Sequence, residues 1–79
     1  MNDSQVLEAL TGVFRELFKD ETLELSESLA SKDVANWDSL TNIILFVEIE
    51  KIFSIRFDTK EIAELANVGE LIRAIQSKL

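Results

Sequence analysis

Near the start of the chain, apolar residues recur every three or four positions, the spacing of one face of an α-helix. The stripe consists of Val6, Leu7, Leu10, Val13, Phe14, Leu17 and Phe18. Asn2, Asp3 and Ser4 are all residue types that cap a helix start, so the cap stays open among them. Gly12 lies inside the pattern at a cost of about 1 kcal/mol relative to alanine. It either permits close approach of another helix or is a tolerated weak position.

The helical spacing lapses at Asp20 and does not return before Trp37. Apolar residues are scattered here among serines and charged residues, at Leu23, Leu25, Leu29 and Val34. A structureless connection of this length exceeds the roughly 12–15 residues usual in compact domains. Its length either counts against the assignment of this stretch as a loop or indicates that the loop has a special role. We expect Trp37 to anchor the loop to the protein, and Ser26 or Ser28 to begin a short turn. Direct contact of Trp37 with a bound group is the alternative.

A second helix is predicted from about Asp38 to Phe53. Asp38 is a favourable N-cap, because its carboxylate accepts a hydrogen bond from a first-turn amide and suits the positive end of the helix dipole. The apolar residues that follow surround most of the helix: Leu40, Ile43, Ile44, Leu45, Phe46, Val47 and Ile49. A domain of this size is too small to bury such a helix completely. Part of its surface is therefore expected to face a partner or a bound group.

Two further helices are predicted near the end of the chain. Asp58 and Glu61 have the spacing of a capping box, which opens a short helix through about Leu65. Asn67 and Glu70 have the same spacing and open the last helix. Its apolar stripe consists of Val68, Leu71, Ile72, Ile75 and Leu79.

These elements predict one all-α domain over residues 1–79, a small four-helix bundle with a long first loop and a short third helix. Ile55 and Phe57 alternate in the connection after the second helix and are predicted to anchor it. The sequence contains no proline, and it shows no internal repeat or low-complexity tract.

Composition argues against several classes of function. The 79 residues include no cysteine and no histidine, so a disulfide and a thiolate metal site are excluded and a zinc site is not expected. The usual nucleophilic triads cannot be assembled from the remaining side chains, and we expect the protein not to be an enzyme.

The charge of the chain bears on its partners. Fifteen acidic and eight basic residues give a net charge of −7, the wrong sign for binding nucleic acid. Such a charge favours basic patches on partner proteins, although it also simply keeps a small domain soluble. The stretch Met1–Ser4 lacks the basic start of a signal peptide, and no apolar run approaches membrane-spanning length. We therefore expect a cytoplasmic protein without membrane insertion, and a monomer.

Ser39 is the candidate for chemistry. It follows the cap residue Asp38 and falls in the first helical turn, where its side chain can point into solvent. An anionic group on its oxygen would lie in the favourable field of the helix N-terminus, so Ser39 is a plausible attachment point for a phosphate ester. The simpler interpretation is that Ser39 only helps to start the helix, since the tripeptide ending at Leu40 recurs by chance.

The position of this motif favours the first interpretation. Trp37-Asp38-Ser39-Leu40 lies near the middle of the chain, after one helix and a long loop, and is followed by the stretches 50–57 and 67–71. This layout resembles the acyl carrier protein and peptidyl carrier protein family over essentially the full chain, most specifically from Trp37 to Ile75.

The resemblance implies that a phosphopantetheinyl transferase, using coenzyme A and a magnesium ion, esterifies Ser39 with a 4′-phosphopantetheine arm. The thiol of this arm would then carry acyl or aminoacyl groups as thioesters from enzyme to enzyme, and tethering would raise their effective concentration. Asp38 would cap the helix and help to present the serine. Leu40 would border the exit of the arm and contact partners, with ordinary packing at the helix start as the alternative.

The resemblance also implies partners, namely an acyl- or aminoacyl-loading ligase and downstream biosynthetic enzymes. The outward, partner-binding strip of the second helix is predicted as Thr41, Ile44, Leu45, Glu48, Lys51 and Ile52. Members that serve fatty acid synthesis typically display several carboxylates there. This strip favours a dedicated biosynthetic pathway of the polyketide, peptide or specialised lipid kind, with housekeeping fatty acid synthesis as the alternative within the family. A helical adaptor that binds partner proteins and carries no prosthetic group is the alternative outside it.

Overall fold

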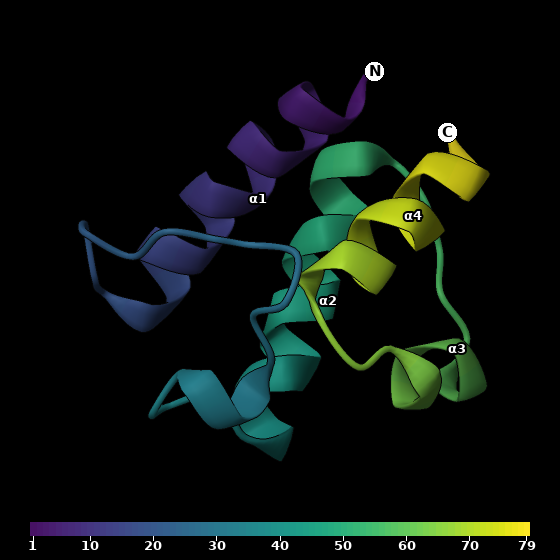
Figure 1. Cartoon of the computed structure of the whole chain (residues 1–79). Coiled ribbons are helices and arrows are strands. Elements are labelled where there is room, and N and C mark those ends of the chain that lie inside the picture. The colour runs from purple at the N-terminus through teal and green to yellow at the C-terminus, as the bar shows by residue number, and fades with distance from the viewer.

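The computed structural model describes residues 1–79, and all of its regular structure is helical (Figure 1). The helices are α1 (Asp3–Phe18), α2 (Ser39–Phe53), α3 (Thr59–Glu64) and α4 (Val68–Lys78), with a short 3₁₀ turn, η1 (Ser31–Asp33), in the long first loop. The predicted all-α fold class of four helices, the third short, is confirmed. Ser26 begins a hydrogen-bonded turn, as one alternative proposed, with its carbonyl accepting from Leu29 N at 3.1 Å.

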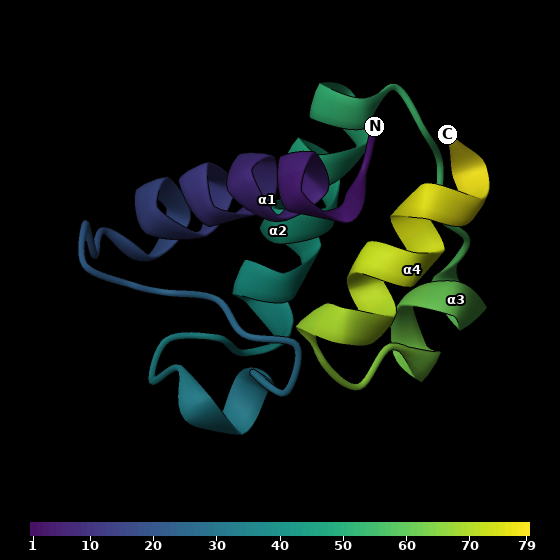
Figure 2. The same ribbon diagram turned by 45° about the horizontal axis from the view of Figure 1, so that its top comes forward.

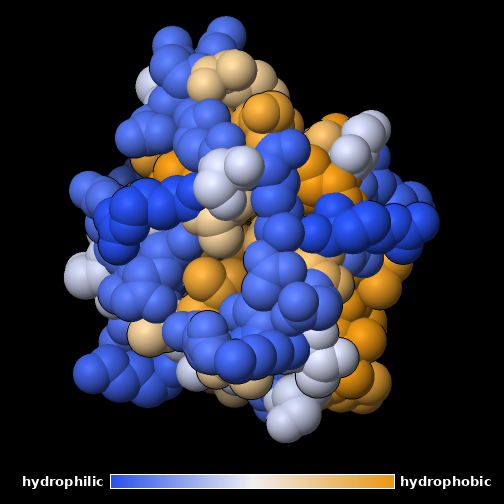
Figure 3. All heavy atoms as spheres, turned by 90° about the vertical axis from the view of Figure 1, so that its right-hand side faces the viewer, coloured by the Kyte–Doolittle hydropathy of each residue, from blue (hydrophilic) through white to orange (hydrophobic).

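The helices share one hydrophobic core. Helix α1 crosses α2 and packs against both α2 and α4, while α3 lies on the outer side of α4 (Figures 1 and 2). The core residues are Val6, Leu10, Val13, Phe14, Leu45, Phe46, Ile49, Phe53, Ile55, Val68, Leu71, Ile72 and Ile75. No residue of α3 is fully buried, and Ile62 and the following Leu65 pack against the core as partly buried side chains. The side of the molecule that carries α3 and α4 is mostly hydrophilic, with hydrophobic atoms visible between the charged side chains (Figure 3).

Capping side chains set the starts of α1 and α3. Asn2 is the cap of α1: its Oδ1 accepts from Gln5 N at 2.8 Å, and Gln5 Oε1 accepts from Asn2 N at 3.0 Å. The predicted box of α3 forms in the same reciprocal way, with distances of 2.7 and 3.1 Å between Asp58 and Glu61. Each pair satisfies backbone amides that the helix itself leaves without partners.

Only one of the two hydrogen bonds predicted for the capping box of α4 forms. Asn67 Oδ1 accepts from Glu70 N at 2.9 Å, as expected. The carboxylate of Glu70, however, accepts from Ala66 N at 3.0 Å rather than from Asn67 N, so the box is not reciprocal. The amide that donates to this carboxylate is thus that of Ala66, one residue before the cap.

The long first loop is fixed to the start of α4 by backbone hydrogen bonds. Val68 N donates to the carbonyl of Leu29 and Gly69 N to that of Glu27, both at 2.9 Å. A Cβ on Gly69 would lie 3.1 Å from both Cβ and O of Glu27, so the glycine permits this close approach. The first amides of α4 thus find partners in the loop, which explains how a connection of unusual length stays ordered.

The remaining predictions concern the loop after α2, the end of α4 and Gly12, and not all of them are confirmed. Ile55 is buried and Phe57 packs edge-on against Phe46 with 5.2 Å between ring centroids, so both anchors after α2 are confirmed. Leu79 was predicted in the stripe of α4 but is 51% exposed, because it lies beyond the last helical residue. Gly12 is exposed, and a Cβ there would meet nothing within 4 Å, so it is a tolerated weak position rather than a close approach of helices.

Candidate functional site

The N-terminus of α2 is closed by a reciprocal capping box. Asp38 Oδ1 accepts from Thr41 N at 3.0 Å, and Thr41 Oγ1 accepts from Asp38 N at 2.8 Å. The hydroxyl of Thr41 also donates to the carbonyl of Asn36 at 2.7 Å. The role of Asp38 as N-cap is therefore confirmed. Thr41, which the sequence placed on the outward strip, uses its hydroxyl to hold the cap and the end of the loop together.

Ser39 is the first residue of α2 and is exposed. No hydrogen bond within the chain uses its hydroxyl, whereas those of Thr41, Thr11 and Ser77 are all engaged. Its position in the first turn, predicted from the Asp38 cap, is confirmed. The side chain is therefore accessible and has no structural task that an attached group would disrupt.

The electrostatics around Ser39 do not make it a nucleophile. Hydrogen bonding from the Thr41 backbone amide holds the pKa of the Asp38 carboxyl below its ordinary value, so Asp38 is a weak base. The chain offers no histidine to take the serine proton. An unactivated hydroxyl of this kind can accept a group only when another enzyme supplies the base.

The protein should lose stability in acid, at pH values below about 5. Hydrogen bonds lower the pKa values of Asp20 (mainly from Thr22) and Asp38, and the Lys78 ammonium, 2.8 Å away, lowers that of Glu61. The folded-state pKa values lie below the ordinary 3.8 for Asp and 4.5 for Glu. Their contribution to stability is therefore complete above the ordinary values and is lost as pH falls from there through the lower folded-state values. Urea titrations should give constant stability from neutrality to about pH 5 and a decline below it. Glu61→Gln should flatten that decline, and equal slopes in both proteins would contradict the assignment to Glu61.

Ser39 lies at the edge of a cleft between α2 and α3, with a volume of about 810 Å³. The cleft is lined mainly by apolar side chains from three helices and the loop, including Trp37, Ile43, Phe46, Ile62, Leu65 and Leu71. An exposed serine without internal hydrogen bonds, next to an apolar cleft, fits a long prosthetic arm that carries an apolar group. The sequence did not reveal this cleft, because α3 supplies one wall through contacts distant in the chain.

Trp37 is an anchor, as predicted. Its ring lies 5.2 Å from the ring of buried Phe14 at an interplanar angle of 82°, and 6.2 Å from that of Phe18. Its Nε1 donates to Asn42 Oδ1 at 2.9 Å. These contacts attach the end of the long loop to α1 and α2. The side chain also lines the cleft, so anchoring and contact with a bound group are compatible roles.

The outward face of α2 is apolar, but its members differ in part from the predicted strip. The exposed apolar residues of this helix are Leu40 (67%), Ile43 (64%), Ile44 (42%), Val47 (48%) and Ile52 (52%). Leu40 is therefore not packed at the helix start, and Ile43 and Val47 were missed. We call Leu40, Ile43, Ile44 and Val47 the α2 apolar face. Ile52 points to the α1 side, where it lines a groove with Ile44 and Glu48.

Leu45 is a correction to the sequence analysis. It was predicted on the outward strip, yet it is fully buried in the core. Phe46, Ile49 and Phe53 lie one helical turn apart and define the inward face, and Leu45 stands one turn before Ile49. The spacing of those three side chains was the signal that could have placed Leu45 correctly.

The charged members of the strip lie where they were predicted. Lys51 is exposed and Glu48 half-buried, and Lys51 Nζ lies 3.6 Å from Glu48 Oε1. An exposed pair one turn apart contributes little to stability. The α2 apolar face is thus followed by one base and one acid, with no cluster of carboxylates.

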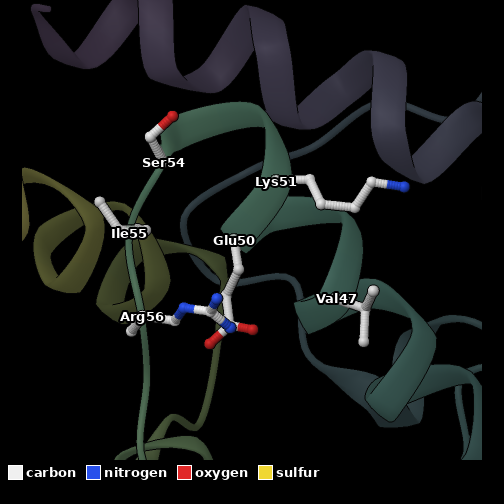
Figure 4. Close-up of a pocket in the computed structure, with 6 residues that line it drawn as sticks. All are labelled: Val47, Glu50, Lys51, Ser54, Ile55 and Arg56. Carbon is white, nitrogen blue, oxygen red and sulfur yellow. The ribbon is translucent and has the colours of Figure 1, made fainter.

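A second hollow, of about 460 Å³, lies at the far end of α2, about 20 Å along the helix from Ser39. It surrounds the turn at Ser54, which adopts a left-handed backbone with φ of 55° (Figure 4). Glu50 Oε2 accepts there from Phe57 N at 2.8 Å, and Lys51 extends away from the other side chains (Figure 4). These contacts hold the connection to α3, and the hollow has no connection with the serine site.

A comparison with solved structures identifies one that is similar to this chain over most of its length. A solution NMR structure of a holo acyl carrier protein from Geobacter metallireducens matches with a TM-score of 0.86 and 36% sequence identity. The match covers 91% of this chain and 83% of the other. No protein-family model matches the sequence, and no curated protein does so.

Proposed function

The chain belongs to the acyl carrier protein family, and on that premise we propose that Ser39 carries a 4′-phosphopantetheine arm. The observation that supports the proposal is that Ser39, at the capped start of α2, is exposed and its hydroxyl forms no hydrogen bond within the chain. The chain also matches a holo acyl carrier protein over most of its length. When bound, the arm supplies the thiol that a sequence without cysteine lacks. The protein itself would not catalyse a reaction: it would deliver acyl or aminoacyl groups, held as thioesters, to other enzymes in the cytoplasm.

The residues around Ser39 have separate tasks in this proposal. Asp38 holds the first turn of α2 in place and keeps the serine presented to a phosphopantetheinyl transferase, which brings coenzyme A. Leu40, 67% exposed, lies next to the attachment point and offers an apolar contact to that transferase and to later enzymes. The cleft between α2 and α3 provides an apolar surface beside the arm.

Mass spectrometry tests the proposal directly. The purified apo-protein, incubated with coenzyme A, Mg²⁺ and a promiscuous transferase, should gain the mass of one phosphopantetheine group on the peptide that contains Ser39. Failure of several transferases to modify it would refute the carrier function. The α2 apolar face favours a second candidate in that case, a helical adaptor that binds partner proteins without an arm.

Within the carrier function, we propose a dedicated biosynthetic pathway rather than housekeeping fatty acid synthesis. The support is the α2 apolar face, which offers aliphatic side chains beside the attachment serine, and Lys51, which would repel a basic enzyme surface. A partner with an apolar contact surface would bind this face, whereas an enzyme that recognises carboxylates would not.

Ile44→Glu combined with Lys51→Glu should improve the holo-protein as a substrate for general fatty acid synthase enzymes. The new carboxylates should act mainly through faster association, and the gain should fade with added salt because exposed charges are screened. Initial rates at several salt concentrations measure the effect. Lys60→Glu with Ser77→Glu is the matched control, since it changes the net charge equally on exposed positions outside α2. Equal turnover of the parent and the α2 variant would show that this face does not determine partner choice.

A further inference from the structure

Asn42 is held in one orientation by Trp37. It lies on α2 one turn after Ser39, is half-buried and lines the cleft between α2 and α3. Its Oδ1 accepts the indole N–H of Trp37 at 2.9 Å. Because an indole N–H is only a donor, the oxygen of the Asn42 amide must face Trp37 and the nitrogen must face the other way. The chemistry of the pair therefore decides the orientation of this amide.

The two hydrogens on Asn42 Nδ2 remain without a partner in the protein. No hydrogen bond within the chain uses this nitrogen, and it is not a buried unsatisfied atom. Of the α2 residues that line the cleft with it, Ile43 and Phe46 cannot accept a hydrogen bond, and the hydroxyl of Ser39 forms none within the chain. A primary amide among apolar side chains is the kind of group that orients a ligand in a cleft, because its donors are directional.

We propose that Asn42 Nδ2 donates a hydrogen bond to an amide carbonyl of the prosthetic arm, close to the attachment of the arm at Ser39. The inference rests on the proposed function, since it requires the arm. Residues three apart on a helix have Cβ atoms about 5–6 Å apart, so Asn42 can reach the part of the arm nearest Ser39 and not the acyl group at the distal thiol. Along the arm from Ser39, the phosphate oxygens and a hydroxyl come first, and the next acceptor is the carbonyl of the first amide, to which we assign the donor of Asn42.

Asn42 is then a positioning residue that acts on every form of the carrier, whatever group it bears. By holding the base of the arm against α2, it favours arm conformations along the cleft over conformations in solvent. Trp37 contributes twice: it anchors the loop through Phe14 and Phe18, and it keeps Asn42 a donor toward the cleft. A purely structural Asn42, present only to satisfy the indole N–H, would have no interaction with the arm.

NMR of isotope-labelled apo- and holo-protein distinguishes these roles. On addition of the arm, the side-chain amide signals of Asn42 should shift and their hydrogen exchange should slow by about two- to tenfold, the range of one neutral hydrogen bond. The side-chain amide of Asn36, exposed in the adjacent loop, is the control in the same sample and should change little. Mass spectrometry of that sample reports arm addition independently.

Variants supply the second measurement, the mobility of the arm near its attachment from NMR relaxation. Asn42→Asp keeps an acceptor for Trp37 but removes both donors, and it should free the arm; Asn36→Asp adds the same charge nearby and should not. Asn42→Leu, which is uncharged, should also free the arm and replaces the aspartate variant if that one loads poorly.

The outcomes separate this inference from the proposed function. A loaded protein with unchanged Asn42 signals, or with equal arm mobility in the Asn42 and Asn36 variants, overturns the inference and leaves the carrier function standing. Absence of arm addition to the parent protein overturns both.

Discussion

Ser39→Ala should abolish arm attachment completely and leave the fold unchanged. The reaction needs the serine oxygen, because the other hydroxyl at the start of α2, that of Thr41, is engaged in the cap. Folding does not need this oxygen, because no hydrogen bond within the chain uses it and Asp38 still caps the helix. Alanine is also a better helix former than serine. We expect no mass gain, and a stability within about 0.5 kcal/mol of the parent in urea titrations.

Ser31→Ala is the matched control for that experiment. Ser31 is exposed and lines the same cleft, so it tests whether any serine near the cleft can accept the arm. This variant should load as the parent does. Modification of the Ser39→Ala protein at a different serine would disprove the assignment of the site.

Trp37→Ala should cost about 3 kcal/mol of stability, near the lower end of the range for deleting a packed aromatic side chain, since Trp37 is only half-buried. The change removes the contacts with Phe14 and Phe18 and leaves Asn42 Oδ1 without its donor. A domain of 79 residues has roughly 4–12 kcal/mol of stability in total, so the loss is a large share. Urea unfolding followed by far-ultraviolet circular dichroism measures it, because the variant has no tryptophan fluorescence.

Trp37→Phe separates packing from hydrogen bonding at this position. It keeps most of the aromatic contact and loses only the bond to Asn42, so it should cost about 1 kcal/mol. The parent contains a single tryptophan, and its emission in the folded state should be blue-shifted relative to the unfolded state. A fully solvent-exposed spectrum, or a Trp37→Ala protein as stable as the parent, would exclude the anchor role.

The helix starts could be predicted because capping is a local interaction. Asp38 binds an amide three residues ahead, as do Asp58 and Asn67, so residue type and spacing alone carried the information. The exposure of Ser39 followed from the same argument, since the residue after an N-cap lies in the first turn of the helix.

Assignments that depended on which side of a helix faces inward were less secure. Helix α2 is apolar nearly all round, so its periodicity did not separate inward from outward positions, and Leu45 was placed on the wrong face. The packing of α1 across α2 decided the matter, because α1 and α4 cover one side of α2 and leave the α2 apolar face uncovered.

The sequence by itself determined the four helices, the N-cap residues of α2, α3 and α4, and the exposed serine at the start of α2. Only the tertiary structure decided the cleft beside that serine, the orientation of Asn42 and the attachment of the long loop to Gly69. The physical reason is the range of the interactions. Caps and stripes involve residues a few positions apart, whereas the wall supplied by α3 and the 2.9 Å bond from Gly69 to Glu27 join segments that meet only when the core forms.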